Sequence, residues 1–123
     1  MRLFIALPLP TSVCNALEKS CNQLKPHLEK GSIVSKQNYH ITMHFLGEVS
    51  IDKIAYLQNA LDHSAQECSA PTLSVNQLST LSGAGIVCGK FKFDNKLTTL
   101  YDKLKSELDS IGFDTDNHKY TPH

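Results

Sequence analysis

Apolar and polar residues alternate along residues 39–49, and this alternation predicts the strand around which the rest of the chain is organised. The apolar positions are Ile41, Met43 and Phe45. The polar positions between them are His40, Thr42 and His44. Because successive residues of a strand point to opposite faces, we expect one face to pack on an apolar core and the other to line a cleft.

The hydrophobic pattern elsewhere predicts four more strands and three helices. A short apolar strand, buried on both faces, is expected at 3–7, and further strands at 32–36, 72–78 and 86–93. Apolar residues at helical spacing predict helices over 13–28, 51–68 and 97–111. Pro26 should end or kink the first helix, and Gly112 is well placed as the C′ residue of the last.

This order of elements predicts an α+β fold, with helices packed on the outside of a largely antiparallel sheet. A chain of 123 residues is long enough to bury a core without metals or disulfides, so we expect a single domain over 1–123. Twelve Lys and Arg balance twelve Asp and Glu, so the net charge is zero. Zero net charge argues against coating long stretches of nucleic acid, but it leaves open the recognition of one phosphate in a pocket.

The cysteines and the N-terminus favour a cytoplasmic protein with reduced thiols. Cys14 and Cys21 lie on one predicted helix about two turns apart, roughly 10 Å, which is too far for a disulfide. The apolar run 2–7 is interrupted by prolines and is too short for a signal sequence or a membrane span. We therefore expect localisation in the cytoplasm and no association with a membrane.

His40 and Thr42 carry the candidate chemistry of the central strand. Two positions apart, their side chains should project from one face roughly 6–7 Å from each other. Imidazole titrates near neutral pH, and a hydroxyl can donate a hydrogen bond to an anionic oxygen. Displacement at phosphorus needs a base and an acid on opposite sides, so one such strand supplies half of a site. His40 and His44 would lie roughly 13 Å apart on a strand, which excludes a metal ion shared by the two.

Three motifs, spread from the first residue to the last, occur together in one known protein family. They are Met1-Arg2-Leu3-Phe4-Ile5-Ala6, His40-Ile41-Thr42 followed by Phe45-Leu46-Gly47-Glu48-Val49, and Tyr120-Thr121-Pro122-His123. In this combination the chain resembles the two-histidine (2H) phosphoesterases. Among them it is most similar to the bacterial and archaeal RNA 2′,3′-cyclic phosphodiesterases, historically called 2′-5′ RNA ligases.

The resemblance implies a fold of two pseudo-symmetric lobes around a central cleft, each lobe contributing one H-x-T strand, with no metal or other cofactor. It implies His40 as the proton donor to the leaving O3′ and His123 as the base that activates water, with Thr42 holding a phosphoryl oxygen. RNA 2′,3′-cyclic phosphate ends or small cyclic nucleotides would be hydrolysed to 2′-phosphates by a monomeric enzyme, and 2′-5′ ligation would be the reverse reaction.

Two neighbours of the first histidine are further candidates for substrate binding. His44 shares the predicted cleft face and would either contact a phosphate or lie solvated at the surface. Tyr39 comes directly before His40, and Tyr120 lies three residues before His123. Either ring could stack on an unpaired base or pack in the core.

The family pattern continues past the second histidine with x-Thr, and the chain ends at His123. We therefore expect a chain truncated inside its second motif. Two alternatives to an active enzyme follow from this expectation. One is a module that binds a nucleotide or RNA end without turnover. The other is an inactive fragment that associates through an open sheet edge.

Overall fold

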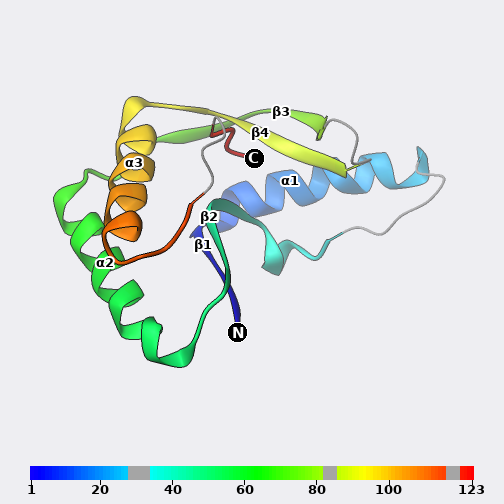
Figure 1. Ribbon diagram of the computed structural model, residues 1–123. Coiled ribbons are helices and arrows are strands. Elements are labelled where there is room, and N and C mark those ends of the chain that lie inside the picture. The colour runs from blue at the N-terminus through cyan, green and yellow to red at the C-terminus, as the bar shows by residue number, and fades with distance from the viewer. Residues whose placement is uncertain (28–33, 82–85, 116–119) are drawn as a thin grey trace. The chain divides into compact units, whose positions relative to one another are not determined.

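A computed structural model describes residues 1–27, 34–81, 86–115 and 120–123 (Figure 1). The strands are β1 (Arg2–Pro8), β2 (His40–Glu48), β3 (Leu73–Leu81) and β4 (Ile86–Phe93). The helices are α1 (Thr11–Leu24), α2 (Ile54–Glu67) and α3 (Asn95–Ser110). The chain divides into two compact units, one formed by Ala6–Ile41 and the other by Met1–Ile5 with Thr42–His123. The α+β class is confirmed, whereas the single domain over 1–123 stays a prediction.

The unit Ala6–Ile41 is built around α1. This helix ends at Leu24 and passes into a 3₁₀ turn, Lys25–His27, as the proline at position 26 predicts. Lys36 starts a second 3₁₀ turn, Lys36–Asn38, and its ammonium contacts Asn15 of α1 at 3.1 Å. The strand predicted at 32–36 is therefore wrong over residues 34–36, and its first two residues lie outside the described part of the chain.

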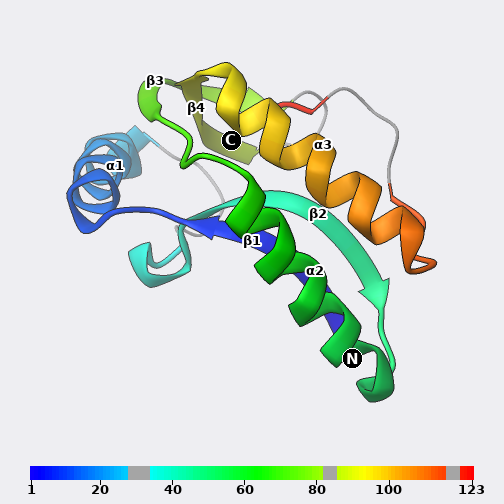
Figure 2. The ribbon, with the colours of Figure 1, turned by 90° about the vertical axis from the view of Figure 1, so that its left-hand side faces the viewer.

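Strands β1 and β2 form a two-stranded sheet. The amide of Val49, just past the end of β2, donates to the carbonyl of Met1, just before β1, at 2.7 Å. The two strands therefore run in opposite directions, as Figure 2 shows. Phe4 is 49% exposed, so the prediction that the first strand is buried on both faces is wrong.

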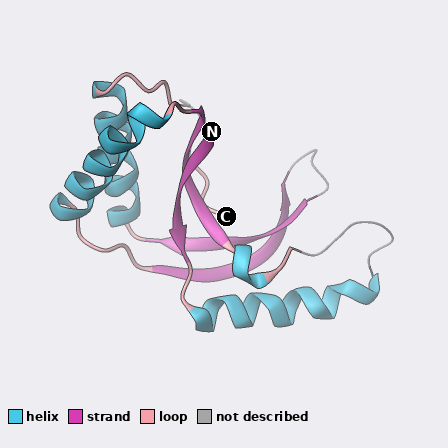
Figure 3. Cartoon of the chain, turned by 90° about the horizontal axis from the view of Figure 1, so that it is seen from below, coloured by secondary structure: helices cyan, strands magenta, loops and turns pink. Residues whose placement is uncertain are grey.

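Strands β3 and β4 form a second antiparallel pair (Figure 3). Leu73 pairs with Phe93 at one end, and Leu81 pairs with Ile86 at the other. Both strands lie where the sequence predicts them. The ladder is irregular between Val75 and Gln77 of β3.

Helices α2 and α3 lie side by side (Figure 2) and bury one apolar stripe each. The buried apolar residues of the two stripes are Leu57, Ala60, Leu97, Leu104 and Leu108. On the exposed side His63 of α2 contacts Glu107 of α3 at 2.7 Å, and Lys103 of α3 contacts Glu67 of α2 at 2.8 Å. Ile51 lies in a 3₁₀ turn before α2 and is 77% exposed, so the helix predicted over 51–68 is wrong at its first three residues.

Both ends of α3 are closed by specific hydrogen bonds. The Asp94 carboxylate accepts from the amide of Lys96 at 3.1 Å and from the amide of Thr72 at 3.2 Å, so it caps the helix and holds the start of β3. At the other end the amide of Phe113 donates to Leu108, and that of Gly112 to Asp109. This pair of bonds is a Schellman motif, and Gly112 has the positive φ (89°) that the motif requires. The predicted role of Gly112 is confirmed.

Two further observations concern the whole described chain. Cys14, Cys21, Cys68 and Cys88 are free thiols in the structure; spacing along the chain had excluded only a disulfide between Cys14 and Cys21. Within the described ranges, no helix combines the length and apolar character needed to cross a lipid bilayer.

Candidate active site

The first half of β2 has the two faces that the alternation predicts. Ile41 and Met43 are 1% and 3% exposed, while His40 at the start of the strand is exposed and Thr42 is half-buried. The apolar side chains anchor the strand, and the H-x-T residues lie on its other face.

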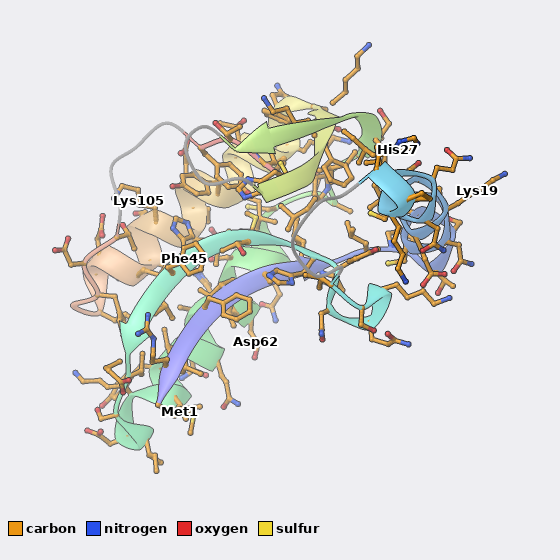
Figure 4. All side chains as sticks on the ribbon, turned by 90° about the vertical axis from the view of Figure 1, so that its right-hand side faces the viewer. Met1, Lys19, His27, Phe45, Asp62 and Lys105 are labelled. Atoms are coloured by element: carbon orange, nitrogen blue, oxygen red, sulfur yellow. The ribbon has the colours of Figure 1, made fainter. Side chains whose placement is uncertain are left out.

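The second half of β2 departs from the prediction. Phe45 (labelled in Figure 4) is 75% exposed and lies against Phe4 of β1, with ring centroids 6.1 Å apart. His44 is only 4% exposed. The alternation predicts buried apolar and exposed polar side chains correctly as far as Met43. Beyond Met43 the prediction is reversed, because the histidine at 44 is buried and the phenylalanine at 45 is exposed.

His44 is buried because an aromatic ring of α3 covers it. Its ring stacks on Tyr101, with centroids 4.2 Å apart and planes 20° apart. Its Nε2 lies 3.1 Å from the Tyr101 carbonyl, which only accepts, so Nε2–H is the donor. The expectation that His44 is solvated is wrong, whereas a contact of His44 with a phosphate stays a prediction.

Burial also sets the charge state of His44. Loss of hydration lowers the pKa of His44 below its usual value, and the positive charge of Lys105 acts in the same direction. The hydrogen bond to the Tyr101 carbonyl opposes the shift without reversing it. His44 is therefore a neutral donor in the folded protein at neutral pH.

This lowered pKa predicts a loss of stability in mild acid. Above about pH 6.5 the ring is neutral in both the folded and the unfolded chain. As the pH falls below that value, the unfolded chain takes up a proton before the folded chain does. The free energy of unfolding therefore decreases, with a slope of at most about 1.4 kcal/mol per pH unit for one proton. Urea titrations between pH 5 and 8, for wild type and His44→Phe, measure this slope.

The phenylalanine variant keeps a ring against Tyr101 and removes the titrating group. We expect its free energy of unfolding to depend less on pH over the same window. An identical slope in the two proteins would show that His44 is not responsible.

The second predicted motif is attached to β2 at the threonine of the first. The hydroxyl of Tyr120 donates to the carbonyl of Thr42 at 2.9 Å and lies 3.2 Å from the sulfur of Met43. Its ring stacks on Tyr101, with centroids 4.1 Å apart and planes 12° apart. Tyr120 is therefore engaged in packing, the alternative to base stacking. Burial raises the pKa of Tyr120 to about 12, so its hydroxyl remains a donor at neutral pH.

His40 and His123 share one local arrangement. Nδ1 of His40 lies 2.7 Å from the carbonyl of Asn38, and Nδ1 of His123 lies 2.9 Å from the carbonyl of Thr121. In each case the partner is the carbonyl two residues earlier. Since a carbonyl only accepts, Nδ1 carries a proton and the neutral tautomer has its lone pair on Nε2. Both side chains are exposed, and in both rings Nδ1 is the nitrogen bound to the backbone.

Tyr39 has its hydroxyl buried within the unit Ala6–Ile41. Burial raises the pKa of Tyr39 to about 12, and the nearby Cys21 thiol of α1 adds to the shift. The hydroxyl end of the ring thus faces α1. This position fits the packing alternative better than stacking on a base.

Tyr101 is the residue that sequence reasoning missed. The pattern assigns it to the apolar stripe of α3, and it lies there, yet it also contacts His44 and Tyr120 on its two sides. The sequence gives one sign of this role, which is a tyrosine within a stripe of leucines. A tyrosine at such a position differs from leucine in having a hydroxyl that usually needs a hydrogen-bond partner when buried. Its partners lie far away in the chain and only the fold brings them together.

Comparison with solved structures identifies the fold. The structure matches TT0787 of Thermus thermophilus with a TM-score of 0.83 and 22% identity, over 100% of this chain and 71% of that one. It matches LigT of E. coli, crystallised with 3′-AMP, with a TM-score of 0.76 and 24% identity, over 99% of this chain and 69% of that one. The fold is that of LigT-type phosphoesterases.

Sequence comparison gives the family. The chain belongs to the family described as LigT-like phosphoesterases, whose pattern it matches over residues 7–87. It is 28% identical over 125 residues to the RNA 2′,3′-cyclic phosphodiesterase of Methanocaldococcus jannaschii. The alignment covers 100% of this chain and 68% of that relative, so the chain spans about two-thirds of its length. The resemblance to the 2H phosphoesterases is confirmed.

Proposed function

We propose that this protein hydrolyses 2′,3′-cyclic phosphate ends of RNA, and small 2′,3′-cyclic nucleotides, without a metal ion. Membership of the phosphoesterase family supports this proposal, as does the relative named RNA 2′,3′-cyclic phosphodiesterase. The observation that carries the assignment of roles is the shared setting of His40 and His123. Each ring is oriented through Nδ1 by the carbonyl two residues earlier, so each uses Nε2 for proton transfer.

The proposed reaction is one in-line displacement at phosphorus. Nε2 of His123 takes a proton from water, and the water oxygen forms a bond to phosphorus. The bond from phosphorus to O3′ breaks, and His40 gives its proton to O3′. The Thr42 hydroxyl donates to a phosphoryl oxygen, whose charge increases during the displacement. The products are a 2′-phosphate and a free 3′-hydroxyl, and attack by an RNA 5′-hydroxyl in place of water would break the same bond and form a 2′-5′ linkage.

Turnover of 2′,3′-cyclic AMP by the full-length protein in excess EDTA tests the proposal. We expect a product that phosphorus NMR identifies as the 2′-phosphate alone. A 3′-phosphate would contradict the roles of the histidines, and loss of activity in EDTA would contradict metal independence. Tight binding with no product over hours would instead favour a nucleotide-binding module.

We further propose that the protein acts in RNA processing, as a cytoplasmic monomer. The four free cysteines of the described residues are compatible with a reducing compartment. Light scattering measures the oligomeric state, and association into larger species would favour the fragment alternative with an open sheet edge.

A further inference from the structure

The segment Tyr120–His123 lies in no helix or strand, although the structure describes all four of its residues. Its attachment to β2 therefore does not come from a ladder of strand hydrogen bonds. The attachment comes instead from the first residue of the segment. Tyr120 contacts the backbone of Thr42 through its hydroxyl and the ring of Tyr101 through its face.

The chain between this attachment and His123 is short and stiff. Three residues span at most roughly 10–11 Å. Pro122 is buried and has a fixed φ, and a residue that precedes proline, here Thr121, is confined to extended conformations. The His123 ring is then bound through Nδ1 to the carbonyl of Thr121. Few free torsions remain between the Tyr120 hydroxyl and the imidazole.

Tyr101, the residue on which Tyr120 stacks, is itself held in place by packing. Tyr101 belongs to α3, whose leucines at 97, 104 and 108 are at most 3% exposed. The opposite face of Tyr101 is covered by His44, which follows Thr42 by two residues on β2. The rings of His44, Tyr101 and Tyr120 thus form one stack, and both of its ends are connected to β2.

We propose that Tyr120 is a positioning residue for the second histidine, holding His123 at a set place relative to Thr42. This inference rests on the proposed function, in which Thr42 binds a phosphoryl oxygen and His123 activates the water that attacks the same phosphorus. The distance between these two groups must then be maintained closely, because misplacement by about 1 Å can cost roughly 100-fold in rate. In this proposal Tyr120 acts through His123 and takes no part in the proton transfers.

Tyr120→Phe separates positioning from packing, because it keeps the ring on Tyr101 and removes only the hydroxyl, with its bond to Thr42 and its contact with the Met43 sulfur. We expect kcat for 2′,3′-cyclic AMP to fall about tenfold with KM changed less than about twofold, since an effect on the displacement step alone lowers kcat. The assay is run well below the melting temperature of each protein. Tyr56→Phe, an equivalent change at a 59% exposed tyrosine of α2, should leave both constants unchanged.

A second readout needs no turnover. In carbon–proton NMR spectra of the full-length protein, Tyr120→Phe should shift or broaden the Cε1–H resonance of His123. The resonance of His63, whose contacts are with Glu67 and Glu107, should stay in place. Tyr56→Phe should leave both resonances unchanged.

The kinetic measurement and the NMR measurement test the positioning role and the proposed function separately. A shifted His123 resonance in a protein whose wild type has no activity would retain the positioning role and overturn the proposed function. An unchanged His123 resonance, or a wild-type kcat in Tyr120→Phe, would overturn the positioning role whatever the substrate. A loss of kcat that Tyr56→Phe reproduces would also overturn it.

Discussion

Replacing His123 with alanine is expected to lower kcat for 2′,3′-cyclic AMP by about 10²–10⁴-fold, and replacing His40 should have an effect of the same size. General acid–base catalysis by one positioned side chain contributes about this factor. Each ring is exposed and oriented by a backbone carbonyl, so its removal takes away the proton transfer and no buried packing. Initial rates with saturating substrate measure the loss. His63→Ala, at an exposed ion pair between α2 and α3, is the matched control.

The two variants should also differ in their dependence on pH. If His123 is the base, His123→Ala loses the acidic limb of the rate profile, because that limb reports deprotonation of the base. If His40 is the acid, His40→Ala loses the basic limb. Wild-type rates in both variants would refute the catalytic assignment, and exchanged limbs would reverse the two roles.

The largest loss of stability is expected from Leu108→Ala, at about 2–5 kcal/mol in the free energy of unfolding. Leu108 is 0% exposed, and its removal leaves a cavity next to the C-terminal Schellman motif of α3. The range reflects how far the surrounding side chains can close the space. Since domains of this size are stable by only about 5–15 kcal/mol, the variant should unfold at much lower urea.

Leu61→Ala gives the matched comparison. Leu61 lies on α2 and is 36% exposed, so the same substitution there should cost less than about 1 kcal/mol. Urea unfolding at neutral pH, analysed with a common m-value, measures both losses. Equal losses at the two positions would mean that the buried stripe of α3 is not the core of its unit.

Elements with strong local signals could be predicted from the sequence. The stripe from Leu97 to Ile111 predicts α3, and the glycine at 112 predicts its end, because the left-handed backbone needed there favours a residue without Cβ. Pro26 likewise predicts the end of α1. In each case the decisive interactions join residues a few positions apart, so they can be recognised in a short window.

Predictions that depended on distant partners were wrong. The pattern placed His44 on a face that lines an open cleft, but Tyr101, which is 57 residues away, covers it. The expected strand at 32–36 had weak apolar alternation, and the turn that begins at Lys36 packs on α1 instead. The bond from the Thr72 amide to Asp94 was not foreseen, because a whole strand pair separates these two residues in the chain.

The local elements, the family and the two candidate histidines could all be recognised in the amino-acid sequence. They could be recognised because periodicity, caps and motifs are properties of neighbouring residues. Which side of β2 is covered at each position depends instead on the packing of distant elements. The same holds for the attachment of Tyr120 to Thr42, 78 residues earlier in the chain. The physical reason is that burial and hydrogen bonding at these positions depend on side chains from α3 and from the C-terminal segment, and no local pattern specifies where those side chains will pack.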